Sequence, residues 1–179
     1  MKKIPTIFGR NLANMKEVLP TQNPVCAWVF AGEGVATRKY DGTCCKVEGK
    51  KLWKRREIKP GQPVPDGFVE EQVDPNTGKR VGWMLVDCSD SQDRYHCEAF
   101  IDQPDGTYEL IGPKVQGNPE KADKHVLVSH AAAEVFDDCP RELDALKAWF
   151  ADRDIEGIVF HHPDGRKAKI KKRDFGMKR

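Results

Sequence analysis

The sequence predicts an α+β fold with mainly antiparallel sheets. Short runs of β-branched and aromatic residues alternate with glycine and proline turns, and only one clear amphipathic helix is present. With 179 residues the chain is long enough for a sizeable core, and we expect a single domain spanning 1–179. It has no run of eighteen apolar residues and no apolar segment behind its basic start, so neither a membrane span nor a secretory signal is expected.

The N-terminal half contains two strand–turn–strand patterns. Strands are predicted at 25–30 and 35–40, separated by a glycine-containing turn. A second hairpin is predicted at 43–47 and 51–55, with Glu-Gly-Lys between its strands. Lys39 is therefore expected at the end of a strand, just before a glycine turn.

The middle of the chain is rich in turn formers. Proline and glycine recur through 59–79, which predicts a surface loop. Strand-like residues follow at 81–87 and again at 107–111, where a Gly-Pro pair ends the pattern.

The clearest helix is predicted after Asp138, with Pro140 near its first turn. It places four apolar side chains on one face, at spacings of three and four residues, namely Leu143, Leu146, Trp149 and Phe150. This helix is expected to pack against a sheet. Two strands at 155–160 and 167–171 are predicted to follow it.

The turn between these last strands contains His161 and His162. Adjacent residues on a strand point to opposite faces, so these two side chains cannot easily share one metal ion. We interpret them as turn residues, with a metal site as the alternative. Trp53 and Trp83 are expected in the core, although either could stack on a base.

Charge is distributed unevenly. The net charge is +2, but residues 166–179 hold eight basic side chains against Asp174 alone, a net +7, which leaves −5 on the rest of the chain. A basic C-terminal tail at 166–179 favours contact with phosphates, and a solvated tail is the alternative.

The six cysteines show no paired spacing typical of zinc sites, and Cys44 and Cys45 are adjacent. We expect reduced thiols in a cytoplasmic protein.

The segment Lys39-Tyr40-Asp41-Gly42 places an amine, a carboxylate and a glycine at a strand-to-turn corner. Alternate strand residues share a face, so Lys39 and Asp41 are expected to point the same way. A lysine attacks phosphorus only as the free amine, which nearby positive charge favours. Taken alone, the segment is also typical of an Asp-Gly hairpin turn.

Four further segments follow it in order. They are Trp-Lys-Arg-Arg at 53–56, Tyr-Glu-Leu-Ile-Gly-Pro at 108–113, Glu-Gly-Ile-Val at 156–159 and Lys-Ile-Lys at 169–171. With the first segment, they resemble the five motifs of the covalent nucleotidyltransferase superfamily, which contains RNA ligases, DNA ligases and mRNA-capping guanylyltransferases. Five motifs in the right order are far more specific than any one of them.

The resemblance implies a role for each matching residue. Lys39 would form a phosphoramidate with the nucleotide, Glu109 would hold the ribose hydroxyls, and Glu156 would serve the metal. The implied catalytic residues are Lys39, Asp41, Lys169 and Lys171. The implied nucleotide-binding residues are Lys39, Gly42, Arg55, Glu109, Glu156, Lys169 and Lys171.

Within the superfamily, the chain is most similar to small RNA ligases of vertebrate, bacterial and phage type. The likeness rests on Lys-Tyr-Asp-Gly-Thr-Cys-Cys at 39–45, Leu52-Trp53, Lys59-Pro60, Gly-Asn-Pro at 117–119 and the segment 3–8. DNA ligases and capping enzymes usually carry an arginine where this chain has Cys44, and Arg55 or Arg56 could supply that charge.

Those enzymes also continue into an OB-fold domain, whereas this chain ends eight residues after Lys171. The resemblance therefore implies a nucleotidyltransferase (ATP-grasp-like) ligase core with antiparallel sheets flanked by helices and no OB-fold domain.

The expected function is that of an ATP-dependent RNA ligase acting in RNA repair. It would use ATP, with AMP covalently on Lys39, and Mg²⁺ (or Mn²⁺), to join RNA 5′-phosphate and 3′-hydroxyl ends, as a monomer. The alternatives are a nucleotidyltransferase that modifies a nucleic-acid end without sealing it, of capping or adenylating type, and a catalytically silent RNA-binding module with the same fold.

Several site residues also have ordinary structural interpretations. Lys169 and Lys171 could guard an exposed strand edge, and Glu109 could be the solvent-facing member of an alternating strand. Glu156 could be a charge in a helix-to-strand connection.

Overall fold

The computed structural model describes residues 2–11, 13–14, 17–75 and 77–179. The chain forms two compact units: unit 1 comprises Met1–Lys3 and Asp41–Ala132, and unit 2 comprises Ile4–Tyr40 and Ala133–Arg179. Both are built mainly of antiparallel strands with few helices, which confirms the predicted α+β class. Whether they make up one domain stays a prediction. Among the described residues, no helix has the length and apolar character needed to cross a membrane.

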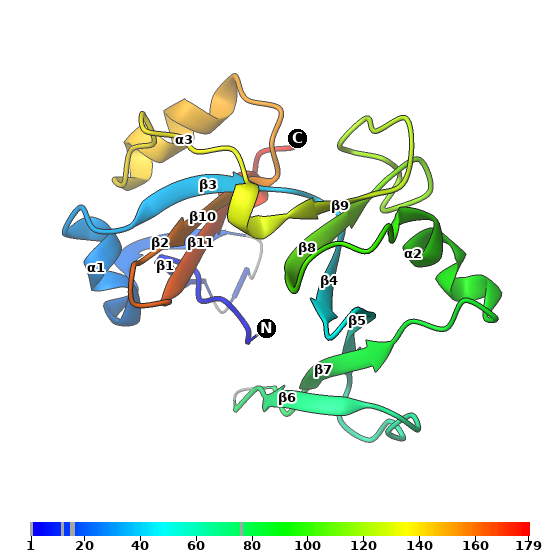
Figure 1. Cartoon of the computed structure of the whole chain (residues 1–179). Coiled ribbons are helices and arrows are strands. Elements are labelled where there is room, and N and C mark those ends of the chain that lie inside the picture. The colour runs from blue at the N-terminus through cyan, green and yellow to red at the C-terminus, as the bar shows by residue number, and fades with distance from the viewer. Residues whose placement is uncertain (1, 12, 15–16, 76) are drawn as a thin grey trace. The chain divides into compact units, whose positions relative to one another are not determined.

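Unit 2 contains a central three-stranded antiparallel sheet in the order β11-β10-β3 (Figure 1). Its strands are β3 (Val35–Lys39), β10 (Gly157–His161) and β11 (Lys167–Lys171). The remaining elements are the hairpin of β1 (Phe8–Arg10) and β2 (Val18–Gln22) and the helices α1 (Ala27–Phe30) and α3 (Leu143–Ala151). Lys39 is the last residue of its strand, as predicted.

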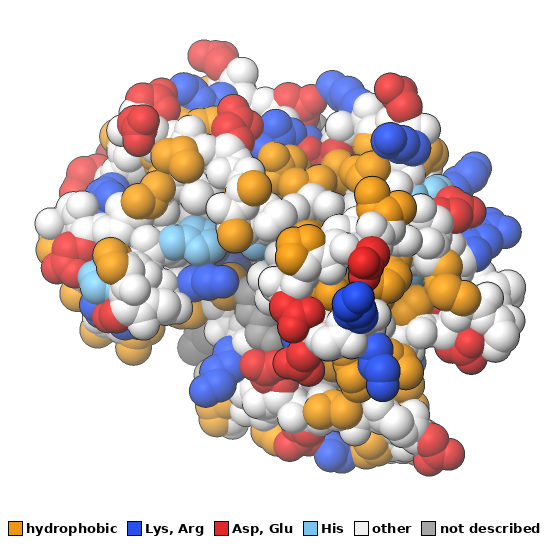
Figure 2. Space-filling model, viewed as in Figure 1, with side chains coloured by type: hydrophobic (Ala, Val, Ile, Leu, Met, Phe, Trp, Pro, Cys, Tyr) orange, Lys and Arg blue, Asp and Glu red, His pale blue; other side chains and the backbone are white. Residues whose placement is uncertain are grey.

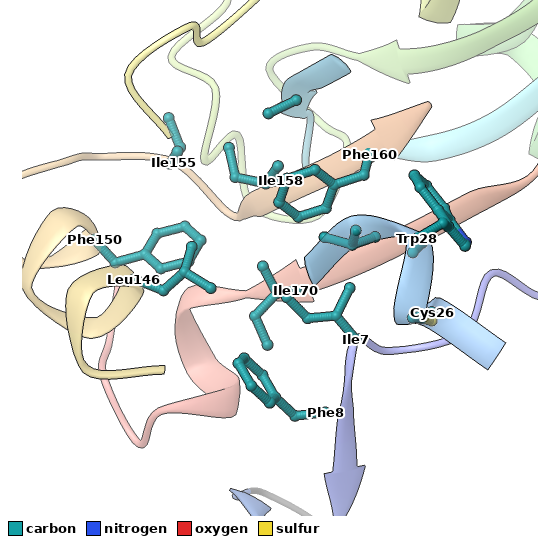
Figure 3. Packing of buried hydrophobic residues seen from close by; sticks show 13 residues of the cluster. Ile7, Phe8, Cys26, Trp28, Leu146, Phe150, Ile155, Ile158, Phe160 and Ile170 are labelled. Carbon is teal, nitrogen blue, oxygen red and sulfur yellow. The ribbon is translucent and has the colours of Figure 1, made fainter. Parts of the chain in front are cut away.

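The apolar face of this sheet carries the core of unit 2. Figure 3 shows Leu146 and Phe150 of α3 beside Ile158 and Ile170 of the sheet, and all four side chains are fully buried. The predicted packing of this helix against a sheet is confirmed. At about 25 cal/mol per Å² of apolar surface, each such side chain contributes roughly 2 kcal/mol of burial free energy.

Two expectations for unit 2 were wrong in detail. Residues 25–30 form a 3-10 turn and α1 rather than a strand, because Asn23 caps the turn and Arg141 donates to the carbonyls of Val29 and Gly34. Helix α3 begins at Leu143, later than the sequence predicts. Contacts over more than a hundred residues override the local β propensity here.

Unit 1 is a six-stranded antiparallel sheet in the order β6-β7-β5-β4-β8-β9. Its strands are β4 (Thr43–Glu48), β5 (Lys51–Ile58), β6 (Val69–Val73), β7 (Arg80–Leu85), β8 (Gly106–Ile111) and β9 (Val126–Ser129), with helix α2 (Arg94–Ala99). The predicted hairpin of β4 and β5 is confirmed, and so is the strand at 107–111. One sheet face carries a buried apolar cluster that includes Cys45, Val47, Leu52, Tyr108 and Leu110.

The predicted loop at 59–79 contains a strand. Residues 69–73 form β6, an edge strand paired with β7 across an irregular register, while Asn76 lies outside the described residues. Most of its side chains are exposed, so it lacks the apolar alternation that reveals an inner strand.

The expectation of six reduced thiols was wrong for two of them. Cys88 and Cys97 form a disulfide with their Cα atoms 5.8 Å apart, because the turn before α2 folds the chain back on itself. Burial raises the pKa of the Cys26 thiol to about 11 and that of the Cys139 thiol to about 12.

The basic segment 166–179 is folded into unit 2. After β11 it forms a short 3-10 helix, in which the buried Lys172 ammonium donates to the carbonyls of Ala151 and Arg153. Arg179 donates to Asp154. A frayed terminus is therefore the wrong description, and the side chain of Lys172 is already used within the protein.

Candidate functional site

The sheet of unit 2 aligns two lysines on either side of a glycine. Gly157, the first residue of the central strand, pairs with Lys39 of β3 and with Lys171 of β11. Cross-strand partners share a sheet face, and residues two apart on a strand also do, so Lys169 belongs to the same face as Lys171. Three lysines from two separate motifs, the first and the last, are thus on one face of one sheet.

Gly157 keeps the space between these strands open. A Cβ atom at this position would collide with the Ile170 carbonyl oxygen and come within 2.9 Å of the Lys171 Cα. Any side chain here would push β11 away from β10 and alter the spacing of the lysines.

Glu156, immediately before Gly157, links the two aligned lysines. Its Oε2 accepts from the Lys39 ammonium at 2.5 Å, and its Oε1 accepts from the Lys171 ammonium. The Lys39, Lys171 and Glu156 side chains are only 20%, 13% and 11% exposed. This is a partly buried charge cluster, in which each ionic contact is stronger than it would be in water.

Buried groups fix the backbone of β11 next to the cluster. The carboxylate of Asp174, which is 2% exposed, accepts from the Lys171 N–H and pairs with Arg10 at 2.9 Å. The Lys172 N–H donates to the Glu156 carbonyl at 2.9 Å. The glutamate and the lysine it contacts are therefore both held by the same turn.

The pKa values of the cluster reflect its excess of positive charge. Burial lowers the pKa of Lys169 to about 8, and repulsion from Lys171 and Lys39 adds to the effect. Burial followed by repulsion from Lys39 lowers the pKa of Lys171. Burial would raise the pKa of Glu156, but attraction to Lys39 and Lys171 more than offsets it and leaves this pKa below its usual value.

An anion would relieve this imbalance. Three lysines and one carboxylate carry a net positive charge when all are ionised, and the cost appears as the lowered pKa of Lys169. A phosphate bound to this face would place negative charge beside the lysines and stabilise their charged forms. The cluster is suited to phosphate binding and to phosphoryl chemistry.

Unit 1 holds a second group of the sequence-predicted residues on one face of its sheet. Three cross-strand pairs belong to this face: Cys44–Glu109, Lys46–Trp53 and Arg55–Trp83. Side chains alternate along β4 and β5, so all six residues point to the same side of the sheet. We call this the Glu109 face. Arg55 shares the face of Cys44 whereas Arg56 is on the opposite one, so Arg55 is the better candidate to replace the missing arginine.

Aromatic side chains also belong to the Glu109 face. Trp83 is 2% exposed, as expected for a core residue, whereas Trp53 is half-buried. The Lys46 ammonium lies over both indole rings, at 5.4 and 5.3 Å from their centroids.

The Glu109 carboxylate is buried and held from two sides. The residue is 8% exposed, its Oε1 accepts from the Gly42 N–H at 3.2 Å, and its Oε2 lies 3.1 Å from His130 Nε2. A Cβ on Gly42 would come within 3.0 Å of the Glu109 Cγ, so the glycine of the first motif is needed for this contact. The interpretation of Glu109 as a solvent-facing residue was wrong.

Asp41 follows the end of β3, which stops at Lys39. The strand alternation used to predict a shared face for Lys39 and Asp41 therefore does not extend to Asp41, and the shared face stays a prediction. The Asp41 N–H donates to the Glu120 carboxylate at 2.8 Å.

His162, in the predicted turn, contacts Glu33 at 2.7 Å.

The surface charge gives no clear path for a nucleic acid on the face drawn in Figure 2. Lys and Arg side chains alternate there with Asp and Glu side chains among the described residues. The function is therefore better inferred from the buried clusters than from a charged patch.

Comparison with known proteins identifies the family. The sequence model of the family described as RNA ligase 1 matches residues 76–179, more than half of the chain. This chain belongs to the RNA ligase 1 family. The matched range includes Glu109, Glu156, Lys169 and Lys171 and begins after Lys39.

Curated relatives extend the RNA ligase 1 similarity. Proteins named RNA ligase 1 from Mus musculus, Rattus norvegicus and Danio rerio are each 26% identical to the chain over 219 aligned positions. Each alignment covers 80% of this chain and 67% of the relative. The expected resemblance to an RNA ligase family is thereby confirmed.

A divalent cation fits the donor set of this RNA ligase 1 family member. Mg²⁺ prefers oxygen ligands and often binds through one or two carboxylates together with substrate phosphates. Glu156 provides one such carboxylate beside the lysines. Among the described residues, no group of three or more His, Cys, Asp or Glu side chains is arranged to hold a metal ion.

His130 was missed by the sequence analysis. It lies in the 3-10 turn after β9, twenty-one residues beyond the glutamate it contacts. A single histidine after a strand has no local pattern that distinguishes it, and only the pairing of β9 with β8 reveals its role.

Proposed function

We propose that the chain is an ATP-dependent RNA ligase that joins an RNA 5′-phosphate to a 3′-hydroxyl through AMP held covalently on Lys39, in the repair of broken RNA. The observation that carries the proposal is the cluster of Lys39, Lys169 and Lys171 around Glu156. Membership of the RNA ligase 1 family supports the choice of RNA as substrate.

In the first step the Lys39 amine attacks the α-phosphorus of ATP. A P–N bond forms, the bond to pyrophosphate breaks, and the amine loses a proton to solvent. Lys169 and Lys171 bind the α-phosphate oxygens and stabilise the charge that develops on them. Burial and repulsion from Lys39 lower the pKa values of both ammonium groups, and a bound phosphate would offset both effects.

Two further transfers complete the reaction. The RNA 5′-phosphate attacks the AMP phosphorus, which breaks the P–N bond and leaves AMP joined to the RNA end through a pyrophosphate link. The 3′-hydroxyl of the other end then attacks the RNA 5′-phosphorus, a phosphodiester forms, and AMP leaves. The amine of Lys39 is regenerated, so the cycle can repeat.

Mg²⁺, or Mn²⁺, held at Glu156 would neutralise phosphate charge. Before nucleotide binds, the Glu156 carboxylate orients Lys39 and Lys171 through its two oxygens. Gly42, Arg55 and Glu109 of unit 1 are proposed to bind the nucleotide, as the resemblance implies, and Asp41 is proposed to assist catalysis.

Exposed basic residues after β11 are candidates to contact the RNA backbone. Arg173 and Lys178 are exposed, whereas Arg179 is partly buried and Lys172 is buried. Phosphate contacts of this type make binding salt-dependent.

Labelling with α-³²P ATP and, separately, α-³²P GTP tests the covalent step. We expect a labelled protein band with ATP that is absent in both Lys39→Ala and Lys39→Arg. Lys147→Ala removes an exposed lysine on α3 and serves as the matched control, which should label normally. A GTP-dependent band would instead favour a capping-type enzyme, and no band with either nucleotide would favour a silent RNA-binding module.

A 5′-phosphorylated RNA with a 3′-hydroxyl then tests sealing. An RNA ligase yields a longer or circular product that resists phosphatase. Accumulation of RNA with AMP on its 5′ end and no joined product would contradict the proposal and favour the end-modifying alternative.

A further inference from the structure

We infer that His130 is a positioning residue for Glu109 and thereby sets the preference for a ribonucleotide over a 2′-deoxyribonucleotide. The inference rests on the proposed function and deepens it. Its basis is the pair of contacts that hold the Glu109 carboxylate, one from the Gly42 N–H and one from His130.

The hydrogen bonds fix the tautomer of His130. A carboxylate only accepts, so His130 Nε2 carries the proton that it donates to Glu109 Oε2 at 3.1 Å. His130 Nδ1 is buried, and no polar atom of the described residues bonds to it. A proton on Nδ1 would be a buried donor without an acceptor, so Nε2 is the ring nitrogen that the geometry selects as the donor.

A carboxylate held in this way retains two acceptor sites. Its two oxygens offer about four lone-pair directions, of which the Gly42 N–H takes one on Oε1 and His130 takes one on Oε2. One direction remains on each oxygen. Two adjacent acceptors of fixed orientation suit the vicinal 2′- and 3′-hydroxyl groups of a ribose, which a 2′-deoxyribose can satisfy only in part.

His130 is needed because Glu109 has several rotatable bonds. Of its two hydrogen bonds, the Glu109 carboxylate would keep only the one from the Gly42 N–H if His130 were removed, and it could rotate about that bond. The conformational entropy of the carboxylate would then be lost when the nucleotide binds, so the affinity for the nucleotide would fall. The loss should appear in the KM for ATP and in the choice of sugar, and less in the rate at saturating ATP.

Single-turnover formation of the labelled lysine, measured against ATP and 2′-dATP concentration, tests this inference. For His130→Ala we expect the KM for ATP to rise about tenfold, the corresponding value for 2′-dATP to change much less, and the maximal rate to stay within about threefold. His130→Gln should restore the ATP preference, because its side-chain amide can donate from nearly the position of Nε2. His130→Asn is too short to do so.

The control variant is His125→Ala. His125 is another histidine of unit 1 that contacts a glutamate, Glu98 at 2.7 Å, and it stacks on Tyr95. The His125→Ala variant should lose stability without any change in the ratio of ATP to 2′-dATP use. If the role of His130 were purely structural, His130→Ala would likewise lose stability and keep this ratio.

A double-mutant cycle shows whether His130 acts through Glu109. Adding His130→Ala to Glu109→Ala should leave the sugar preference where Glu109→Ala alone puts it. An unchanged preference in His130→Ala, or full additivity of the two substitutions, would overturn the inference. If His130→Ala does not fold, an equal sugar preference in the Gln and Asn variants would overturn it. No labelling of the wild type would overturn the proposed function and this inference with it.

Discussion

The two glutamates at the centre of the two units are held in opposite ways. Glu156 of unit 2 accepts from two lysines, on a sheet face that also carries Lys169, whose pKa is lowered to about 8 by burial and by the neighbouring lysines. Glu109 of unit 1 is just as buried, but its partners are a backbone N–H and the Nε2 atom of His130.

The two sites affect the stability of the folded chain in different ways. In unit 2 the sheet register forces like charges together, so folding carries an electrostatic cost that an anionic ligand would remove. In unit 1 the carboxylate accepts from two N–H donors before any ligand binds, and these contacts set its orientation in advance. Function and stability are therefore opposed in unit 2 and compatible in unit 1.

The largest loss of stability is expected from Glu156→Gln. The substitution removes the charge that Lys39 and Lys171 share in a partly buried site, and breaking such a pair costs about 3 kcal/mol or more in the free energy of unfolding. Urea unfolding of Glu156→Gln and the wild type at pH 7 measures this loss of free energy. Glu134→Gln is the control, because that side chain is 51% exposed where it pairs with Arg38, and it should cost under about 1 kcal/mol. Equal losses in the two variants would contradict the comparison.

Gly157→Ala should lower the free energy of unfolding by about 2 kcal/mol. The added Cβ would meet the backbone of Ile170 and Lys171, which cannot move without shifting β11. The control is Gly9→Ala in the same unit, where the nearest atom to the new Cβ is an ordinary 3.5 Å away. Thermal unfolding and lysine labelling are measured together, and labelling should fall along with stability. Normal labelling in Gly157→Ala would show that the lysine spacing is not critical.

Lys169→Met should raise stability by about 1 to 2 kcal/mol at pH 7 while it impairs labelling. The pKa of Lys169 is about 8 in the folded chain against an ordinary 10.5, so the folded state binds fewer protons between these pH values. The wild type should therefore gain stability from pH 8 to 10.5, and the full penalty is present below pH 8.

Urea unfolding across pH 7 to 10.5 checks the sign of this effect. The gain of Lys169→Met over the wild type should shrink as the pH rises through 8 and beyond. Lys167→Met, two residues earlier on β11, is the control and should change stability by no more than about 0.5 kcal/mol. If the stability difference between Lys169→Met and the wild type were the same at all pH values, the gain would come from packing instead of charge.

Local patterns in the sequence predict the parts of the fold that local contacts determine. The hairpin around Gly49 and the strand that ends at Lys39 were both predicted, because turn chemistry and alternation act over a few residues. The segment 25–30 was not, since its helical form depends on Arg141. The edge strand β6 was also missed, because its exposed side chains carry no apolar signal.

The site divides in the same way. Lys39, Glu156 and Lys171 could be named from the order of motifs, and the structure brings them together. The contact of His130 with Glu109 could not be predicted, because it depends on the register of β8 and β9. The Cys88–Cys97 disulfide likewise depends on a turn that no spacing rule marks.

Glu109→Gln should have the smallest effect, a loss of about 1 kcal/mol in the free energy of unfolding. The amide oxygen can still accept from the Gly42 N–H, and the amide NH₂ can donate to His130 Nε2 once the ring proton moves to Nδ1. Only the buried Nδ1–H is then left without an acceptor. The His130 ring can exchange its donor and acceptor nitrogens in this way, whereas the lysine ammonium groups around Glu156 can only donate.

Urea unfolding of Glu109→Gln beside Glu156→Gln measures the difference directly, and the ¹⁵N chemical shifts of the His130 ring report the change of tautomer. A loss as large as that of Glu156→Gln, or an Nε2–H tautomer that persists in the variant, would show that the Glu109 network does not rearrange. The hydrogen bonds around Glu109 would then be no more able to rearrange than the lysine contacts of Glu156, which would contradict the proposed difference between the two sites.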